Sequence, residues 1–175
     1  LVDRVSTRGE FSDLVWTMEG ELGTSHAYEM GGDYERAPQY RPGYLGVDVE
    51  WDSNVTWERG GTEHRGGFRI THVVRGASWE DSATSPLARP GVDATEGDVI
   101  VAVNRTPFQQ GDSLQEALVH RSGEDLEVTV LHEDVDDSEE ATERYSVELL
   151  RSEQRARYLE WVEQNRQRVH QATDG

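Results

Sequence analysis

Apolar residues recur every three or four positions in a segment near the start of the chain. They are Phe11, Leu14, Val15, Met18 and Leu22. This spacing predicts an amphipathic helix over residues 7–22. Thr7 and Glu10 have the spacing of a capping box at its start, and Gly23 follows its last apolar residue, as a left-handed helix end requires.

A second stripe of this kind lies near the end of the chain. Its members are Tyr158, Trp161, Val162, Val169 and Ala172. It predicts a helix over residues 152–172, in which Glu153 stands four positions before Arg157 and can pair with it. One stripe on one helix is not stable alone. We therefore expect both helices to dock on further sequence, and the chain to be cut from a longer protein.

Alternation with period two dominates the middle of the chain and predicts β-strands. The remaining segments differ in composition. A continuously apolar segment predicts a strand buried on both faces, a polar segment rich in glycine predicts a loop, and an acidic segment predicts a solvated turn. The predicted alternating strands are 45–51, 68–74, 126–130 and 145–149, and the predicted buried strand is 99–103. Residues 52–67 are predicted to form a hairpin loop, and short helices are expected within 85–98 and from Ser113 to His120. Residues 133–143 contain seven acids in eleven residues and are predicted to form a hairpin tip or, alternatively, a weak divalent-ion site.

The composition of the chain excludes several kinds of reactive site and binding partner. The 175 residues contain no cysteine, so disulfides, thiolate metal sites and a cysteine nucleophile are excluded. Thirty-five acids against seventeen bases give a net charge of −18, which repels nucleic acid. The longest apolar run has five residues and no signal peptide is evident, so we expect no membrane contact and a cytoplasmic protein. Acidity without lysine fits either a salt-adapted cytoplasm or the arginine bias of a GC-rich genome.

The order of these elements predicts an α+β fold: a partly open β-barrel or sandwich of five to six strands with two short helices, flanked by one amphipathic helix on each side. The middle region resembles a PDZ domain of the bacterial, permuted kind. The motifs that carry the resemblance are Ser85-Pro86-Leu87-Ala88, Gly97-Asp98-Val99-Ile100 and Val103-Asn104. Arg105 departs from the usual glycine after the asparagine, and we expect Asn104 to keep the left-handed turn.

The resemblance implies a peptide-binding groove. Backbone amides in the turn formed by Tyr44, Leu45, Gly46 and Val47 would face a peptide's terminal carboxylate, and the strand that follows would pair with the peptide. Leu114 and Leu118 would line the opposite wall together with Leu45 and Val47. The alternative is a spacer with a PDZ shape that binds no peptide.

The stretch "GTSHAY" places Ser25 beside His26 just after the first helix. Adjacent side chains in a chain point apart, so Ser25 is a poor nucleophile for His26. Taken alone, the pair reads as a polar helix end. The order "ELGTSHAYEMGGDY", "YLGVDVEW", the PDZ-like segment and "RYLEWVEQNR" resembles tricorn protease over the whole chain.

That resemblance implies three regions: 1–40 as the end of a helical domain, 41–151 as a PDZ domain, and 152–175 as the opening helix of a crotonase-like catalytic domain. It implies that His26 is the general base and that Ser25 orients the acidic member of a tetrad, whose serine and glutamate lie outside these residues. Implied partners are peptides, the downstream catalytic domain and neighbouring subunits of a homo-hexamer. No cofactor and no metal are expected.

Three functions stay open: part of a cytosolic serine peptidase that degrades oligopeptides, a stand-alone peptide-binding module, and an assembly module that joins subunits. C-terminal processing proteases also combine a helical segment, a PDZ domain and a crotonase-like core. Their Ser-Lys pair contrasts with the histidine motif that precedes the PDZ-like segment here.

Overall fold

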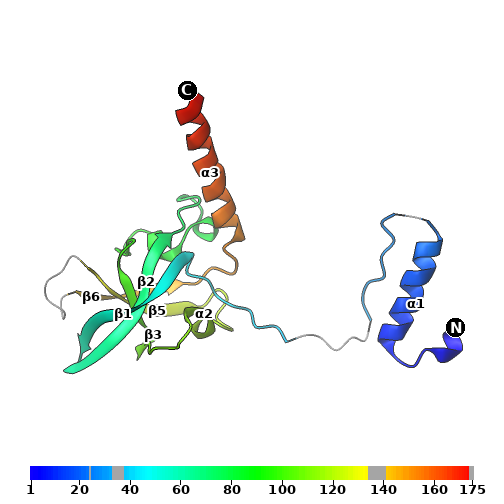
Figure 1. The fold of residues 1–175 in the computed structure, drawn as a ribbon, viewed down its shortest axis with the longest axis horizontal. Coiled ribbons are helices and arrows are strands. Elements are labelled where there is room, and N and C mark those ends of the chain that lie inside the picture. Colours follow the sequence, from blue (N-terminus) through cyan, green and yellow to red (C-terminus); the bar gives the residue numbers. More distant parts are fainter. Residues whose placement is uncertain (24, 33–37, 134–140, 174–175) are drawn as a thin grey trace. The chain divides into compact units, whose positions relative to one another are not determined.

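The computed structural model describes residues 1–23, 25–32, 38–133 and 141–173. They form two compact units, Leu1–Gln39 and Tyr40–Gly175. The first contains a short 3₁₀-helix, η1 (Val2–Arg4), and the helix α1 (Arg8–Glu21); the second contains the sheet and the helix α3 (Gln154–Thr173) (Figure 1).

The predicted first helix is confirmed together with its cap. Thr7 accepts a hydrogen bond from the backbone N–H of Glu10, and the Glu10 carboxylate accepts from the N–H groups of Ser6 and Thr7. These backbone donors lower the pKa of Glu10. Gly23 has a φ of +62°, as expected after a helix. The apolar stripe is only partly covered within this unit: Leu14 and Val15 are half-buried, whereas Met18 is 58% exposed.

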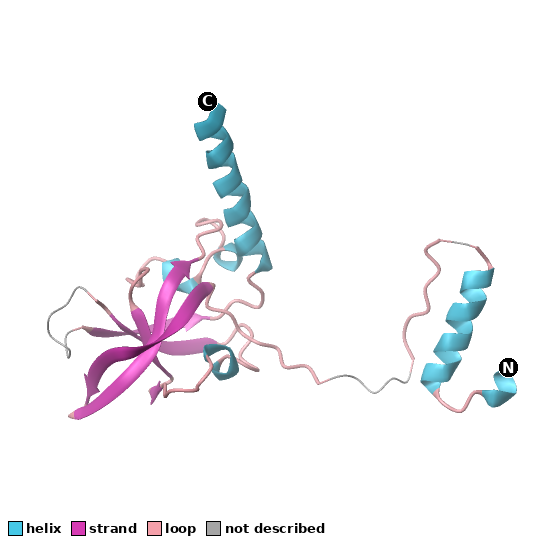
Figure 2. Ribbon diagram, in the orientation of Figure 1, coloured by secondary structure: helices cyan, strands magenta, loops and turns pink. Residues whose placement is uncertain are grey.

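The second unit is built on one antiparallel sheet of six strands in the order β1-β2-β3-β5-β6, with β4 paired to β3 (Figure 2). This confirms the predicted α+β, PDZ-like fold. The strands are β1 (Val47–Arg59), β2 (Thr62–Val73), β3 (Val99–Val103), β4 (Thr106–Pro107), β5 (Asp125–Leu131) and β6 (Thr142–Glu148).

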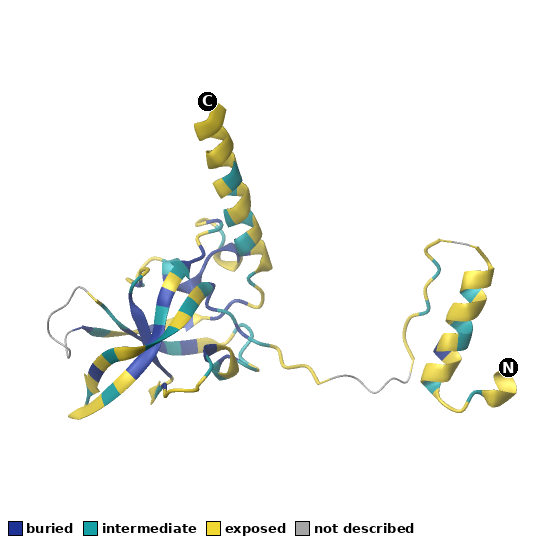
Figure 3. Cartoon of the chain, viewed as in Figure 1, coloured by how far each residue is buried: buried dark blue, intermediate teal, exposed yellow. Residues whose placement is uncertain are grey.

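The core lies on both faces of β3, all five residues of which are buried, as its continuous apolarity predicts. One face packs Ile100 and Val103 against Leu87, Leu126 and other side chains of the main core. The other face packs Val99 and Val101 against Trp57 in a smaller cluster. Figure 3 shows the buried strands meeting at the centre of this unit.

The prediction of a hairpin loop over residues 52–67 is wrong. β1 and β2 continue as a long ribbon to a tight turn at Gly60 and Gly61, whose φ angles are +57° and +78°. A register shift between Asp52 and Thr56 interrupts the alternation. Beyond it the ribbon turns Trp57 into the smaller cluster, where only 2% of it is exposed. A bulge of this kind hides a strand from period-two analysis.

Two predicted helices are shorter in the structure than expected. The helix expected from Ser113 to His120 is a single turn, α2 (Leu114–Ala117), and the helix expected within 85–98 is the 3₁₀ turn η3 (Pro86–Ala88), which follows η2 (Asp81–Ala83). Asn104 does take the left-handed conformation, with φ +46°, and Arg105 shares it at +65°. Of the acidic stretch, residues 134–140 lie outside the described residues, so its role stays a prediction.

Helix α3 packs against the sheet unit through its first turns only. Ala156 is fully buried, and Gly76 approaches it so closely that a Cβ there would lie 2.3 Å from the Ala156 carbonyl oxygen. Further along, Trp161 is 57% exposed and stacks on Tyr158, with ring centroids 5.9 Å apart. Most of α3 is therefore exposed in this unit (Figure 3).

Candidate functional site

Ser25 and His26 lie in the turn that follows α1, and both are exposed. His26 has a left-handed φ of +67°, a conformation that few side chains adopt and that often marks a functional turn. Its Nδ1 lies 3.1 Å from the Tyr28 hydroxyl. Among the interactions of the described residues, none joins Ser25 to His26, and Thr24 lies outside those residues. The imidazole face is thus open to an incoming group.

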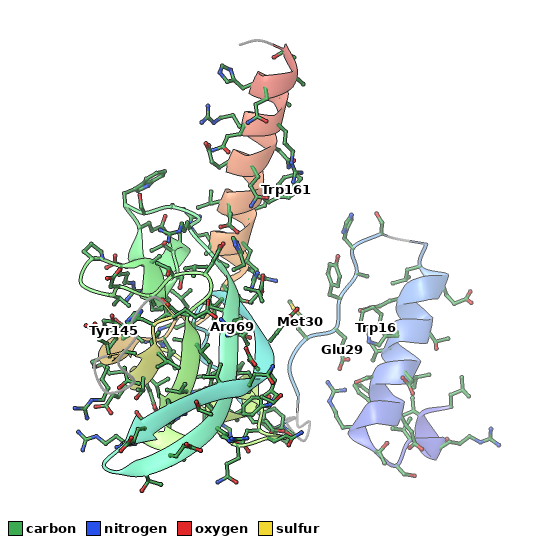
Figure 4. The ribbon with its side chains drawn as sticks, turned by 60° about the vertical axis from the view of Figure 1, so that its left-hand side comes forward. Trp16, Glu29, Met30, Arg69, Tyr145 and Trp161 are labelled. Carbon is green, nitrogen blue, oxygen red and sulfur yellow. The ribbon has the colours of Figure 1, made fainter. Side chains whose placement is uncertain are left out.

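A polar cluster that sequence reasoning missed holds this turn to α1. Glu29, three residues after His26, forms an ion pair with Arg8 and accepts a hydrogen bond of 3.1 Å from the Ser12 hydroxyl. Arg8 also donates to the Ser12 hydroxyl at 3.0 Å, and Ser12 is 7% exposed. Figure 4 shows Glu29 beside α1. The chain after His26 is therefore folded back along the helix. No periodic signal links residues this far apart in sequence.

A groove in the second unit, of about 340 Å³, lies between the start of β1 and α2. The structure brings all six predicted groove residues to it: Tyr44, Leu45, Gly46, Val47, Leu114 and Leu118. Leu45, Leu114 and Leu118 are at most 4% exposed and form its apolar floor. Because β1 is at the end of the strand order, its outer edge is available to pair with another strand.

The turn before β1 carries unused hydrogen-bond donors. Within the described part of the chain, no acceptor is found for the backbone N–H of Leu45 or of Gly46, although both residues are buried. Gly46 has a φ of +62°, and a Cβ there would lie 3.1 Å from Ser85 Cα. The Ser85 hydroxyl donates to the Leu45 carbonyl at 2.6 Å. Ser85 of the "SPLA" motif thus holds the turn that lines the groove.

The groove has a charged rim that the sequence did not predict. Arg157 of α3 donates to Asp48 of β1, with Nη2 2.7 Å from Oδ1, and its Nε lies 2.9 Å from Glu153 Oε1. The second contact is the predicted pair along α3. The Arg157 guanidinium lowers the pKa of Asp48. All three side chains line the groove, so α3 forms part of its wall.

His72 joins α3 to the sheet from the other side of β1. Its Nε2 lies 2.9 Å from Glu160 of α3, and its Nδ1 lies 2.8 Å from Glu96. The Glu160 carboxylate also accepts from the backbone N–H of Arg75 at 2.8 Å. The hydrogen bond to Glu160, then that to Glu96, raise the pKa of His72, and His72 in turn lowers the pKa of Glu96.

The stability of this contact is expected to depend on pH. Because the pKa of His72 is raised in the folded protein, its ion pairs stabilise the fold fully below the ordinary histidine pKa of 6.5, and this stabilisation is lost as pH rises through the folded pKa. The pKa of Glu96 is lowered, so the stabilisation that Glu96 provides is lost as pH falls below about 4.5. The wild type should melt at a higher temperature than His72→Gln at pH 6. We expect this difference in melting temperature to shrink by about 2–4 °C between pH 6 and pH 9. His64→Gln is the control; a flat difference for His72→Gln contradicts the prediction.

Two of the remaining histidines, His64 and His132, contact neighbouring side chains. His64, predicted in a loop, lies in β2 and stacks on Trp57, with centroids 4.7 Å apart. His132 Nδ1 lies 3.1 Å from Asp98 Oδ2, and its other nitrogen is 3.3 Å from the Tyr145 hydroxyl. Burial, followed by the hydrogen bond with Glu143, raises the pKa of Tyr145 to about 12. Across the residues that the structure describes, no three acids or histidines form a metal-binding group, and no helix is long and apolar enough to cross a bilayer.

The antiparallel sheet, the glycine turn with unused amides and the groove beside α2 define a PDZ domain. The family model described as the tricorn protease PDZ domain matches residues 43–152. The chain therefore belongs to the tricorn protease family.

Its relatives include tricorn protease homolog 1 of Streptomyces coelicolor, 34% identical, and the tricorn protease homolog of Saccharolobus solfataricus, 32% identical. Both matches cover 100% of this chain and 15% of the relative. A crystal structure of the tricorn protease has the same fold, with a TM-score of 0.73 and 22% identity over 98% of this chain and 15% of that one. The chain thus spans less than a fifth of the length of these relatives.

Proposed function

We propose that the chain is the part of a tricorn-type serine peptidase that supplies the general base, and that the complete protein degrades oligopeptides in the cytoplasm. One observation carries the proposal: the His26 imidazole is exposed and sits on a left-handed turn fastened to α1. A general base that is exposed in this way, with no nucleophile beside it in the described residues, can receive its nucleophile from another domain.

In this proposal His26 takes the proton from a distant serine hydroxyl and later gives it to the leaving amine. In the tautomer whose Nδ1–H donates to the Tyr28 hydroxyl, 3.1 Å away, Nε2 keeps its lone pair for that proton. Ser25 hydrogen-bonds and orients the glutamate of the tetrad. The serine and the glutamate belong to a catalytic domain outside these 175 residues, so the chain alone is inactive. Substitution of His26 in the complete protein tests the assignment.

Exposed apolar faces support partners for both units. Phe11 and Met18 on α1, and Tyr158 and Trp161 on α3, are between 42% and 61% exposed. Exposed large apolar side chains on one helix suit protein contacts. We assign them to the downstream catalytic domain and to neighbouring subunits, with residues 1–40, 41–151 and 152–175 as the three regions of the chain.

A second function is favoured by the groove itself. Its apolar floor suits one hydrophobic side chain, the free β1 edge suits an added peptide strand, and the Leu45 and Gly46 amides suit a terminal carboxylate. The PDZ domain is thus proposed to bind the C-terminal end of a peptide. A spacer without this activity is the competing interpretation.

Titration of the isotope-labelled chain with a peptide ending in leucine separates the two. We expect micromolar affinity, shifts at the Leu45 and Gly46 amide signals, and at least a tenfold loss of affinity when the terminal carboxylate is amidated. A peptide ending in aspartate is the control for the apolar floor. Absence of binding at millimolar peptide supports the spacer.

A further inference from the structure

The charged rim of the groove is built from two elements that are distant in sequence. Asp48 belongs to β1, whereas Arg157 belongs to the first turn of α3 and Glu153 immediately precedes that helix. Arg157 bridges the two carboxylates through different nitrogens, using Nη1 and Nη2 toward Asp48 and Nε toward Glu153. Its side chain is 36% exposed and that of Asp48 is 51% exposed, so a ligand can reach both.

We propose that Arg157 is the cation that binds the terminal carboxylate of a peptide in the groove, and that this carboxylate replaces Asp48 on its guanidinium. The inference rests on the proposed peptide binding by the PDZ domain. It makes a residue of α3, outside the segment matched by the PDZ family model, part of the peptide site.

Charge favours this assignment. Two carboxylates and one guanidinium line the groove, a formal charge of −1, and Arg157 is the one cation among its described lining residues. The whole chain carries −18. Arg157 is therefore the charged side chain of the groove that attracts an anionic peptide end, whereas Asp48 and Glu153 repel it. The guanidinium binds carboxylates through paired N–H groups, a geometry that Asp48 already uses.

The exchange of carboxylates keeps the Arg157 guanidinium paired throughout. While the peptide binds, Glu153 remains on Nε, and Asp48 moves into water from a side chain that is already half exposed. Asp48 is thus a competitor for the ligand, held in place by the protein. It follows that Asp48 and Arg157 have opposite effects on affinity, whereas an ion pair that only docks α3 would give both residues the same effect.

The test compares two variants in titrations with the leucine-ended peptide. We expect Arg157→Gln to weaken binding about tenfold or more, and Asp48→Asn to strengthen it about two- to fivefold. With the amidated peptide both variants should match the wild type. Arg155→Gln is the matched control, because Arg155 also ties α3 to the sheet unit through Glu80, at 2.9 Å, without lining the groove; it should leave the affinity unchanged.

The outcomes are distinct. If wild type binds no peptide, the proposed binding function fails and the role of Arg157 with it. If wild type binds the free carboxylate but Arg157→Gln and Asp48→Asn both weaken binding, or neither changes it, the groove binds peptides through its amides alone and Arg157 only docks α3. An equal loss in Arg155→Gln likewise overturns the proposal.

Discussion

Alanine in place of His26 should lower kcat/KM of the complete protein for oligopeptides by about 10³- to 10⁶-fold. Without the imidazole, the attacking serine loses the acceptor for its proton and the leaving amine loses its donor. Substrate binding should be little affected, because the imidazole takes part in proton transfer rather than in holding the substrate. Steady-state kinetics with a fluorogenic peptide measures the effect, which should fall on kcat rather than on KM.

Two variants calibrate this result. Tyr28→Phe removes the hydrogen bond at Nδ1 of His26, 3.1 Å long, and should cost less than about tenfold, because the backbone turn remains. His64→Ala, in the second unit, should have no effect on kcat. The 175-residue chain alone should show no turnover. Turnover by the chain alone that is blocked by His26→Ala would reveal a nucleophile within it and overturn the division of roles.

Local patterns sufficed for much of the fold. The capping box and glycine fixed both ends of α1, and the unbroken apolar run identified β3, because these signals lie within a few neighbouring residues. The long ribbon of β1 and β2 escaped because its bulge between Asp52 and Thr56 changes the period midway. α2 was overestimated because Leu114, Ala117 and Leu118 satisfy helical spacing whether the helix has one turn or two.

Some residues of the candidate sites could be predicted from the sequence, and others could not. The six groove residues could be predicted because they belong to short motifs with fixed roles in a PDZ fold. The Arg8–Glu29 pair and the Asp48–Arg157 pair could not, since charged residues are abundant in this chain and tertiary structure alone decides which of them meet. The second pair couples α3 to the groove, so the docking of α3 bears on the proposed peptide binding.

Valine at position 76 should separate α3 from the sheet unit. A Cβ there would meet two backbone carbonyl oxygens, of Ala156 at 2.3 Å and of Ala83 at 2.6 Å, and neither can rotate away as a side chain could. We expect Gly76→Val to lower the free energy of unfolding by about 2–3 kcal/mol and to raise amide hydrogen exchange in the first turns of α3. Chemical denaturation and exchange measured by mass spectrometry check the two effects.

Ser78→Val is the control, because Ser78 is exposed on the same loop and should change neither quantity. If α3 carries the cation of the peptide site, Gly76→Val should also weaken binding of the free carboxylate and spare that of the amide. Faster exchange in α3 with unchanged preference for the carboxylate would show that the groove recognises peptide ends through its own amides. Unchanged exchange would instead show that α3 slides over the added methyl groups, and that its close packing at Gly76 is not what holds it.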